Sequence, residues 1–287
     1  NCFMKNFFQS FKVSRQVIHV RSSYYTTSLK RICVFPNLIV IGAMKAGTTF
    51  LHNQLNLSPD IFASRSKELG YYLNRYGEKY SVEHIRGSRS DEQVLRKVIQ
   101  GYKNEKFILD SSTHYTKYPS FGRNTPENIH AKRPNARLIY VVRDPFDRLL
   151  SEHAHMVNSG IPKYRNELCN IINHSSLNVA KHDLPQIVLN SCYGFQLNRY
   201  LRHFGWNQIK IIDFKSLVND TANVLNDIFD FLEIDSVDFE NKLFSKVNES
   251  RENNSFQDIL QFLDTSVVSQ LEEIFETDQE YFKYLRQ

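Results

Sequence analysis

Four short runs of apolar residues are spaced along the chain, and amphipathic stretches separate them. The runs are continuous rather than alternating, and they cover 38–41, 106–109, 138–142 and 209–212. Continuous runs of this kind are typical of parallel strands that helices cover on both faces. The periodicity elsewhere predicts helices at about 48–57, 91–103, 125–132, 145–158, 190–204 and 221–232, with a final pair at 256–263 and 266–285.

The alternation of predicted strands and helices indicates the fold class. It favours an α/β fold with a doubly wound, mainly parallel sheet that helices flank. In such a sheet, ligands bind beyond the carboxyl ends of the strands. We therefore expect the segments after Ile41, Leu109 and Val142 to surround one site. Residues 1–34 precede the first strand and are predicted to form a basic N-terminal arm, and 35–287 one domain.

The net charge of +5 is unevenly placed along the 287 residues. Seven Lys and Arg residues precede the first acidic residue, Asp60, and the remaining 29 basic and 31 acidic residues nearly cancel. A nucleic-acid-binding protein normally carries a strong basic field over its folded part. The composition therefore argues against a nucleic acid polymer as a partner.

The N-terminal arm is interpreted as a solvated segment, with a targeting or stem segment as the alternative. Its apolar clusters are too short to span a membrane. The sequence leaves the compartment open between the cytoplasm and, if an anchor precedes Asn1, the Golgi lumen. Five sequons, which are compatible with a glycoprotein, begin at Asn56, Asn173, Asn219, Asn248 and Asn253. The sequence does not define the oligomeric state.

The cysteines and histidines show no spacing typical of a metal site. None of the four cysteines forms a Cys-x-x-Cys pair. His153 and His155 are two positions apart on a predicted helix, so they face different directions. The sequence therefore predicts no metal.

The first predicted strand runs into a glycine-bearing loop, residues 42–49, that leads into a helix. Such a loop directs backbone N–H groups at an anion, and the helix dipole favours negative charge there. A Walker loop needs Gly, four residues and then Gly-Lys-Ser/Thr. Gly42 and Gly47 have that spacing, but Thr48 replaces the lysine, which lies inside the loop as Lys45. No Walker-B acid is evident, so a Mg²⁺-triphosphate site is not indicated.

This loop resembles the 5'-phosphosulfate-binding loop of sulfotransferases that use 3'-phosphoadenosine 5'-phosphosulfate (PAPS), particularly the heparan-sulfate type and its bacterial relatives. The resemblance implies a sheet similar to that of P-loop NTPases. It also implies that Lys45 contacts the bridging oxygen and the transferred group, and that Ala46, Gly47, Thr48 and Thr49 bind the 5'-phosphate. A fixed ammonium would stabilise the charge that develops on the leaving phosphate.

A second candidate anion site follows the predicted strand at 138–142. Asp144 can cap a helix that begins at Pro145, which leaves Arg143 at the end of the strand. Ser151 lies eight positions after Arg143. The Arg fork and the Ser hydroxyl both suit a phosphate group. The alternative is that Arg143 pairs with Asp147 and that Ser151 is a surface residue.

In the sulfotransferases that the chain resembles, an Arg and a Ser at this spacing hold the 3'-phosphate. The resemblance therefore implies this role for Arg143 and Ser151. It also places Tyr193 near the 3'-phosphate, with a core aromatic as the alternative. A loop at 246–254 corresponds to one that closes over the nucleotide in relatives. It offers Arg251 as a contact but lacks the glycine of the relatives.

Two residues are candidates for the base that accepts a proton from the acceptor, a task that suits Glu or His. Glu68 corresponds to the base of the heparan-sulfate-type relatives, and His114 follows the predicted strand at 106–109. The alternative for Glu68 is a charge at the N-terminus of a helix, where the dipole favours it. The alternative for His114 is a loop histidine that is hydrogen-bonded to the backbone. Ser111 replaces a lysine of the relatives, which argues against a highly sulfated polymer as acceptor.

These features together favour a PAPS-dependent sulfotransferase without a metal, which acts on a hydroxyl or amine of a carbohydrate or small molecule. Residues 35–287 would form the sulfotransferase domain. The alternatives are a P-loop-type nucleotide kinase and a non-catalytic protein that binds a nucleotide or a sulfated glycan. The position of Lys45 counts against the kinase. The presence of Lys45, Thr48, Arg143 and Ser151 counts against a decayed site.

Overall fold

The protein is described by a computed structural model that covers residues 35–63, 67–73, 99–160, 184–237, 263 and 265–287. Five parallel strands form one sheet in the order β2-β3-β1-β4-β5. The strands are β1 (Leu38–Gly42), β2 (Ile61–Ala63), β3 (Phe107–Ser111), β4 (Arg137–Val142) and β5 (Ile209–Asp213). The predicted α/β fold with a parallel sheet is confirmed.

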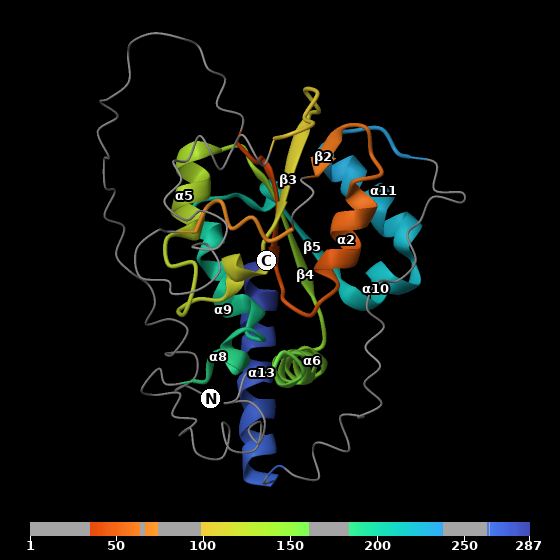
Figure 1. Cartoon of the computed structure of the whole chain (residues 1–287). Coiled ribbons are helices and arrows are strands. Elements are labelled where there is room, and N and C mark those ends of the chain that lie inside the picture. The colour runs from red at the N-terminus through yellow and green to blue at the C-terminus, as the bar shows by residue number, and fades with distance from the viewer. Residues whose placement is uncertain (1–34, 64–66, 74–98, 161–183, 238–262, 264) are drawn as a thin grey trace.

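Helices cover both faces of the sheet (Figure 1). On one side lie α2 (Thr48–Leu55), α10 (Phe214–Asn219) and α11 (Thr221–Leu232), and on the other lie α5 (Thr125–Lys132) and α9 (Tyr193–Asn198). Beyond the end of β4 lie α6 (Pro145–Asn158), α8 (Gln186–Leu189) and α13 (Thr265–Leu285). The described residues also form the 3₁₀ turns η1 (Thr113–Thr116), η4 (Tyr200–Arg202) and η5 (Trp206–Gln208). In the described part of the chain, no helix is both long and apolar enough for a membrane span.

The core explains why the sequence shows continuous apolar runs. Every residue of β1 and of β3 is buried, because helices lie on both faces of these strands. A second apolar cluster joins α6, α8, α9 and α13, and it includes Leu149, Val188, Phe195, Leu271 and Phe275. The C-terminal helix therefore packs against α6, α8 and α9.

The bounds predicted for α5, α6 and α11 are confirmed, but the single helix predicted at 190–204 is wrong. There α9 ends at Asn198 and η4 follows. The hydroxyl of Tyr200 donates a hydrogen bond of 2.7 Å to the Tyr115 carbonyl, and Arg199 donates to the Gly122 carbonyl at 3.0 Å. These contacts with the segment after β3 accompany the change from α-helix to the tighter 3₁₀ turn.

The prediction of a helix at 91–103 is wrong where the structure describes it. Residues 99–101 form a turn that the Tyr102 N–H closes on the Ile99 carbonyl at 3.0 Å. Gly101 has a φ of 98°, which ends any helix there. Residues 91–98, the helix predicted at 256–263 apart from its last residue, and the arm at 1–34 lie outside the described residues.

Candidate functional site

The loop between β1 and α2 is shaped by close contacts that only glycine permits. A Cβ atom on Gly42 would collide with the hydroxyl of Thr116, which donates a hydrogen bond of 2.9 Å to the Ile41 carbonyl. Gly47 has a φ of 82° and lies against the ring of Phe214. Lys45 also has a positive φ, at 66°. The loop is therefore a tightly folded turn that delivers the chain into α2.

The first turn of α2 has the character of an anion site. Asp144 and Asp213 cap α6 and α10 by accepting backbone N–H bonds of 3.0 and 2.8 Å. Among the described residues, no side chain caps α2 in this way. No side chain of the described residues therefore competes with an anion for the leading N–H groups of α2 and the positive end of its dipole. Thr48 is buried and Thr49 half-buried at this end.

Arg143 joins the two predicted anion motifs. Its Nη1 donates to the Lys45 carbonyl at 3.2 Å, although the two residues are 98 positions apart. The guanidinium lies 4.9 Å from the centre of the Phe214 ring, and Nη2 lies 3.8 Å from the Asp147 carboxylate. The Asp147 pairing that the sequence offered as an alternative is therefore present beside the contact with the loop. The Nε atom is enclosed and has no hydrogen-bond partner in the described part of the chain, which fits an additional acceptor at this place.

Tyr193 lies directly against Arg143. Its hydroxyl accepts the Arg143 backbone N–H at 3.2 Å, and its ring meets the Tyr140 ring edge-on at 5.8 Å. Burial raises the pKa of Tyr193, so its hydroxyl keeps its proton. Ser151 is buried two turns into α6, and within the described residues no hydrogen bond joins it to Arg143. Arg251 lies outside the described residues.

The position of Tyr193 depends on a buried acid that the sequence reasoning did not identify. Asp278 of α13 is 1% exposed, and its carboxylate accepts the N–H groups of Gly194 and Phe195 at 2.9 and 2.8 Å. Burial raises the pKa of Asp278 to about 7, against the effect of these bonds. The available signal was its spacing, because Asp278 falls on the buried stripe of α13 formed by Val267, Leu271, Ile274 and Phe275.

The two candidate bases lie side by side. His114 Nδ1 is 3.7 Å from Glu68 Oε2, and the same carboxylate accepts bonds from Lys67 Nζ at 2.6 Å and from the Thr113 N–H at 2.8 Å. Burial on its own raises the pKa of Glu68, but the contacts with His114, Lys67 and Thr113 outweigh it and lower the pKa to about 2. Glu68 is therefore ionised at neutral pH.

A fully buried acid, Asp110, anchors the segment that carries Glu68. Its carboxylate accepts the hydroxyls of Ser112 and Tyr115, both at 2.5 Å. These hydroxyls in turn accept the N–H groups of Gly70 at 2.8 Å and Tyr72 at 3.1 Å. Burial raises the pKa of Asp110 to about 6 despite these bonds. No sequence pattern marks Asp110 as a site residue, since an acid inside a strand gives no periodic signal.

Contacts with β1 and α2 place the Glu68 segment beside the phosphate loop. The Ser111 carbonyl accepts the Glu68 N–H at 3.1 Å, and its hydroxyl lies 2.9 Å from His52 Nδ1 of α2. The Ser112 N–H donates to the Val40 carbonyl at 3.2 Å. The structure thus gathers Lys45, Glu68, His114, Arg143 and Tyr193 around the carboxyl ends of β1, β3 and β4, as expected for a doubly wound sheet.

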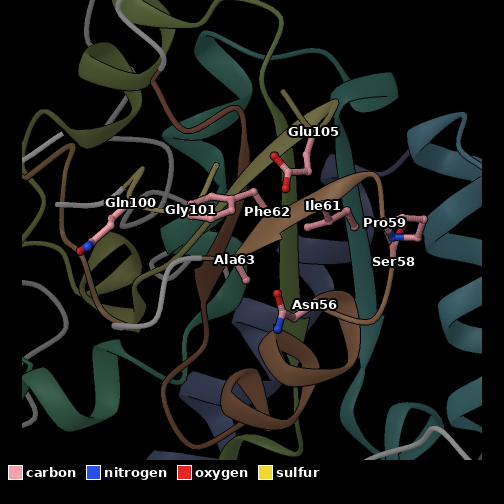
Figure 2. A pocket seen from close by; sticks show the side chains of 9 residues that line it. All are labelled: Asn56, Ser58, Pro59, Ile61, Phe62, Ala63, Gln100, Gly101 and Glu105. Carbon is pink, nitrogen blue, oxygen red and sulfur yellow. The ribbon is translucent and has the colours of Figure 1, made fainter. Parts of the chain in front are cut away.

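A cavity of about 330 Å³ opens elsewhere, along the edge strand β2 (Figure 2). It is lined by Asn56, Ser58, Pro59, Ile61, Phe62, Ala63, Gln100, Gly101 and Glu105. None of these is a predicted site residue, so we do not assign the chemistry to this cavity. Within the described ranges, no three His, Cys, Asp or Glu residues are grouped as metal ligands would be.

Comparisons with known proteins agree with this geometry. The sequence profile of the "Sulfotransferase family" matches residues 36–238. The membrane-associated sulfotransferase kil1 of Dictyostelium discoideum is 34% identical over 126 residues, which are 43% of this chain and 23% of that protein. Human heparan sulfate glucosamine 3-O-sulfotransferase 6 is 26% identical over 208 residues, which are 69% of this chain and 52% of that protein. The chain thus spans about half or less of these relatives.

Solved structures show the same fold. A sulfotransferase from Alicyclobacillus acidocaldarius superposes with a TM-score of 0.65 at 22% identity, over 88% of this chain and 96% of that one. Mouse sulfotransferase SULT7A1, solved in complex with PAP, superposes with a TM-score of 0.51 at 14% identity, over 88% of each chain.

Proposed function

The chain belongs to the sulfotransferase family, and on this basis we propose that it transfers a sulfuryl group from PAPS to a hydroxyl or amine of an acceptor. We further propose that the acceptor is a carbohydrate or a small molecule. The carbohydrate sulfotransferases among the relatives support the first of these classes. We propose no metal for the reaction.

One observation carries the proposal: the hydrogen bond of 3.2 Å from Arg143 Nη1 to the Lys45 carbonyl. It brings an uncapped helix start and a guanidinium together, 98 positions apart in sequence. A nucleotide with anionic groups at both its 5' and 3' ends needs two such sites in one place. The enclosed Arg143 Nε without a partner also fits a phosphate oxygen.

The site residues then take distinct roles. PAPS, when bound, supplies a sulfuryl group on a good leaving group. Lys45 stabilises the bridging oxygen as its bond to sulfur breaks. His114 accepts the acceptor proton as the acceptor atom bonds to sulfur, and the ionised Glu68 beside it, at 3.7 Å, stabilises the imidazolium. Arg143 and Tyr193 hold the 3' end.

The proton assignment predicts an order of effects for two variants. His114→Asn should lower turnover about 10²- to 10⁴-fold, because it removes the proton acceptor. Glu68→Gln should lower turnover less, since it removes only the charge that supports the imidazolium. Steady-state rates at saturating PAPS check this. The reverse order, with Glu68→Gln the more damaging change, would assign the proton to Glu68.

Calorimetry with 3'-phosphoadenosine 5'-phosphate (PAP), ATP and a sulfated oligosaccharide tests the proposed function itself. We expect binding of PAP with a dissociation constant of about 1 μM or lower, without any need for Mg²⁺. Tight, Mg²⁺-dependent binding of ATP would instead support the nucleotide kinase. Binding of the oligosaccharide alone would support the non-catalytic protein. A screen of acceptors with labelled PAPS then identifies the substrate.

Arg143→Ala should chiefly weaken nucleotide binding. We expect the dissociation constant of PAP to rise about 10- to 100-fold, because a charge-assisted bond to phosphate is lost. The control is Arg137→Ala, at the other end of β4. This change removes a guanidinium that pairs with Glu233 at 2.8 Å. Equal PAP affinity in Arg143→Ala and the wild type would show that Arg143 does not contribute to nucleotide binding.

A further inference from the structure

Lys117 directly follows η1, the 3₁₀ turn that carries His114. Its N–H donates to the His114 carbonyl at 3.4 Å, which is the i to i+3 bond of such a turn. Lys117 is thus the C-cap of η1, three residues after His114, which faces Glu68. Lys117 belongs to neither anion motif, so no sequence pattern marks it.

Within the described ranges, Lys117 has carboxylates as electrostatic neighbours but no bonded counter-ion. Its side chain is buried, and its electrostatic neighbours include the carboxylates of Glu152 and Glu68. Each carboxylate already has a closer cation, Arg148 at 2.5 Å and Lys67 at 2.6 Å. None of the hydrogen bonds and ion pairs of the described residues involves Lys117 Nζ. Burial lowers the pKa of Lys117, as expected for an ammonium without a bonded counter-ion.

A buried ammonium that bonds to no carboxylate of the described residues suits a place where an anion binds, because a buried charge is costly unless it is paired. The fold brings η1 close to such a place. The Thr116 hydroxyl, one residue before Lys117, donates to the Ile41 carbonyl at the end of β1, just before the phosphate loop. In the proposed reaction, the anionic sulfuryl group lies between Lys45 and His114.

We propose that Lys117 is a further catalytic residue, whose ammonium contacts the non-bridging oxygens of the sulfuryl group on the side where the acceptor attacks. On the opposite side, Lys45 stabilises the bridging oxygen. This oxygen keeps the electron pair when its bond to sulfur breaks. The acceptor proton goes to His114, and Lys117 keeps its own protons throughout. This assignment rests on the proposed function.

The test compares Lys117→Met with Lys210→Met, a control that removes a half-buried lysine from the edge strand β5. Calorimetry should show that wild type and control bind PAPS about tenfold more tightly than PAP, and that Lys117→Met loses this preference while its PAP affinity is unchanged. Turnover of Lys117→Met should fall about 100-fold. Its melting temperature should stay close to that of the wild type, because Lys117 Nζ makes no hydrogen bond or close ion pair with the described residues that the change would remove.

Three results would overturn the role of Lys117. One is an unchanged preference for PAPS over PAP in Lys117→Met. Another is an increase in the acceptor KM with unchanged kcat, which would mean that Lys117 binds the acceptor instead. The third is a marked fall in melting temperature, which would make Lys117 a structural ion-pair partner. Absence of PAP binding by the wild-type protein would instead refute the proposed function, and the assignment with it.

Discussion

Lys45→Ala is expected to lower turnover about 10³-fold while the affinity for PAP stays within about threefold of the wild type. The ammonium of Lys45 matters most when charge develops on the bridging oxygen, so its loss acts on the transition state more than on the bound ground state. Alanine keeps the Cβ atom, so the strain of the positive φ of 66° is the same in both proteins. Single-turnover rates and PAP calorimetry measure the two quantities.

The matched control is Lys106→Ala. Lys106 lies before β3, outside the site, and its Nζ donates to the Glu233 carbonyl at 2.5 Å. It should leave turnover and PAP affinity near the wild-type values. If Lys45→Ala weakens PAP binding by as large a factor as it lowers turnover, Lys45 contributes to ground-state binding and not specifically to the transfer step.

Arg148→Met is expected to destabilise the folded protein by about 3–5 kcal/mol, as is usual when one partner of a buried ion pair is removed. Arg148 is fully buried, and its three donors bind the Glu152 carboxylate at 2.5 Å, the Ser191 hydroxyl at 2.6 Å and the Ile187 carbonyl at 2.7 Å. It thereby joins α6 to α8 and the start of α9. Chemical denaturation at pH 7 measures the loss.

The double variant Arg148→Met/Glu152→Leu is the control for this pair. It removes both charges, and we expect it to recover most of the lost stability. A double variant as unstable as Arg148→Met would show that the bonds to Ser191 and Ile187, and not the ion pair, carry the effect.

The same pair predicts a pH dependence. Burial raises the pKa of Glu152, but Arg148 and then Lys117 outweigh it and lower the pKa below the ordinary 4.5. In the wild type this contributes stability above pH 4.5 that is lost as the pH falls. Without Arg148, burial dominates and the folded pKa rises, so the sign reverses. The stability deficit of Arg148→Met should therefore shrink between pH 7 and pH 5.

The strands and the main helices could be predicted because their signals are local. The run 38–41 is continuous because β1 is covered on both faces, and α6 begins at Pro145 because Asp144 caps it. The anion motifs were also local, and the rule for parallel sheets indicated that they would meet. The contact between Arg143 and Lys45 follows from β1 and β4 being neighbours.

The rest of the site depends on contacts between segments distant in sequence. The pairing of Glu68 with His114 requires β2 and β3 to be adjacent, which no local pattern gives. Asp110 and Asp278 are acids in otherwise apolar elements. Their structural role follows only from the hydrogen bonds that they accept from hydroxyl and N–H groups distant in sequence or on neighbouring segments. The break between α9 and η4 likewise follows from the contact of Tyr200 with Tyr115.

The reach of α13 back to α9 bears on how recombinant fragments should be designed. The family match ends at residue 238, and a truncation there would follow the profile. It would also delete Asp278, leave the amides of Gly194 and Phe195 without their acceptor, and release the turn that holds Tyr193 against Arg143. Cloning boundaries should therefore extend at least through Leu285, the last residue of α13.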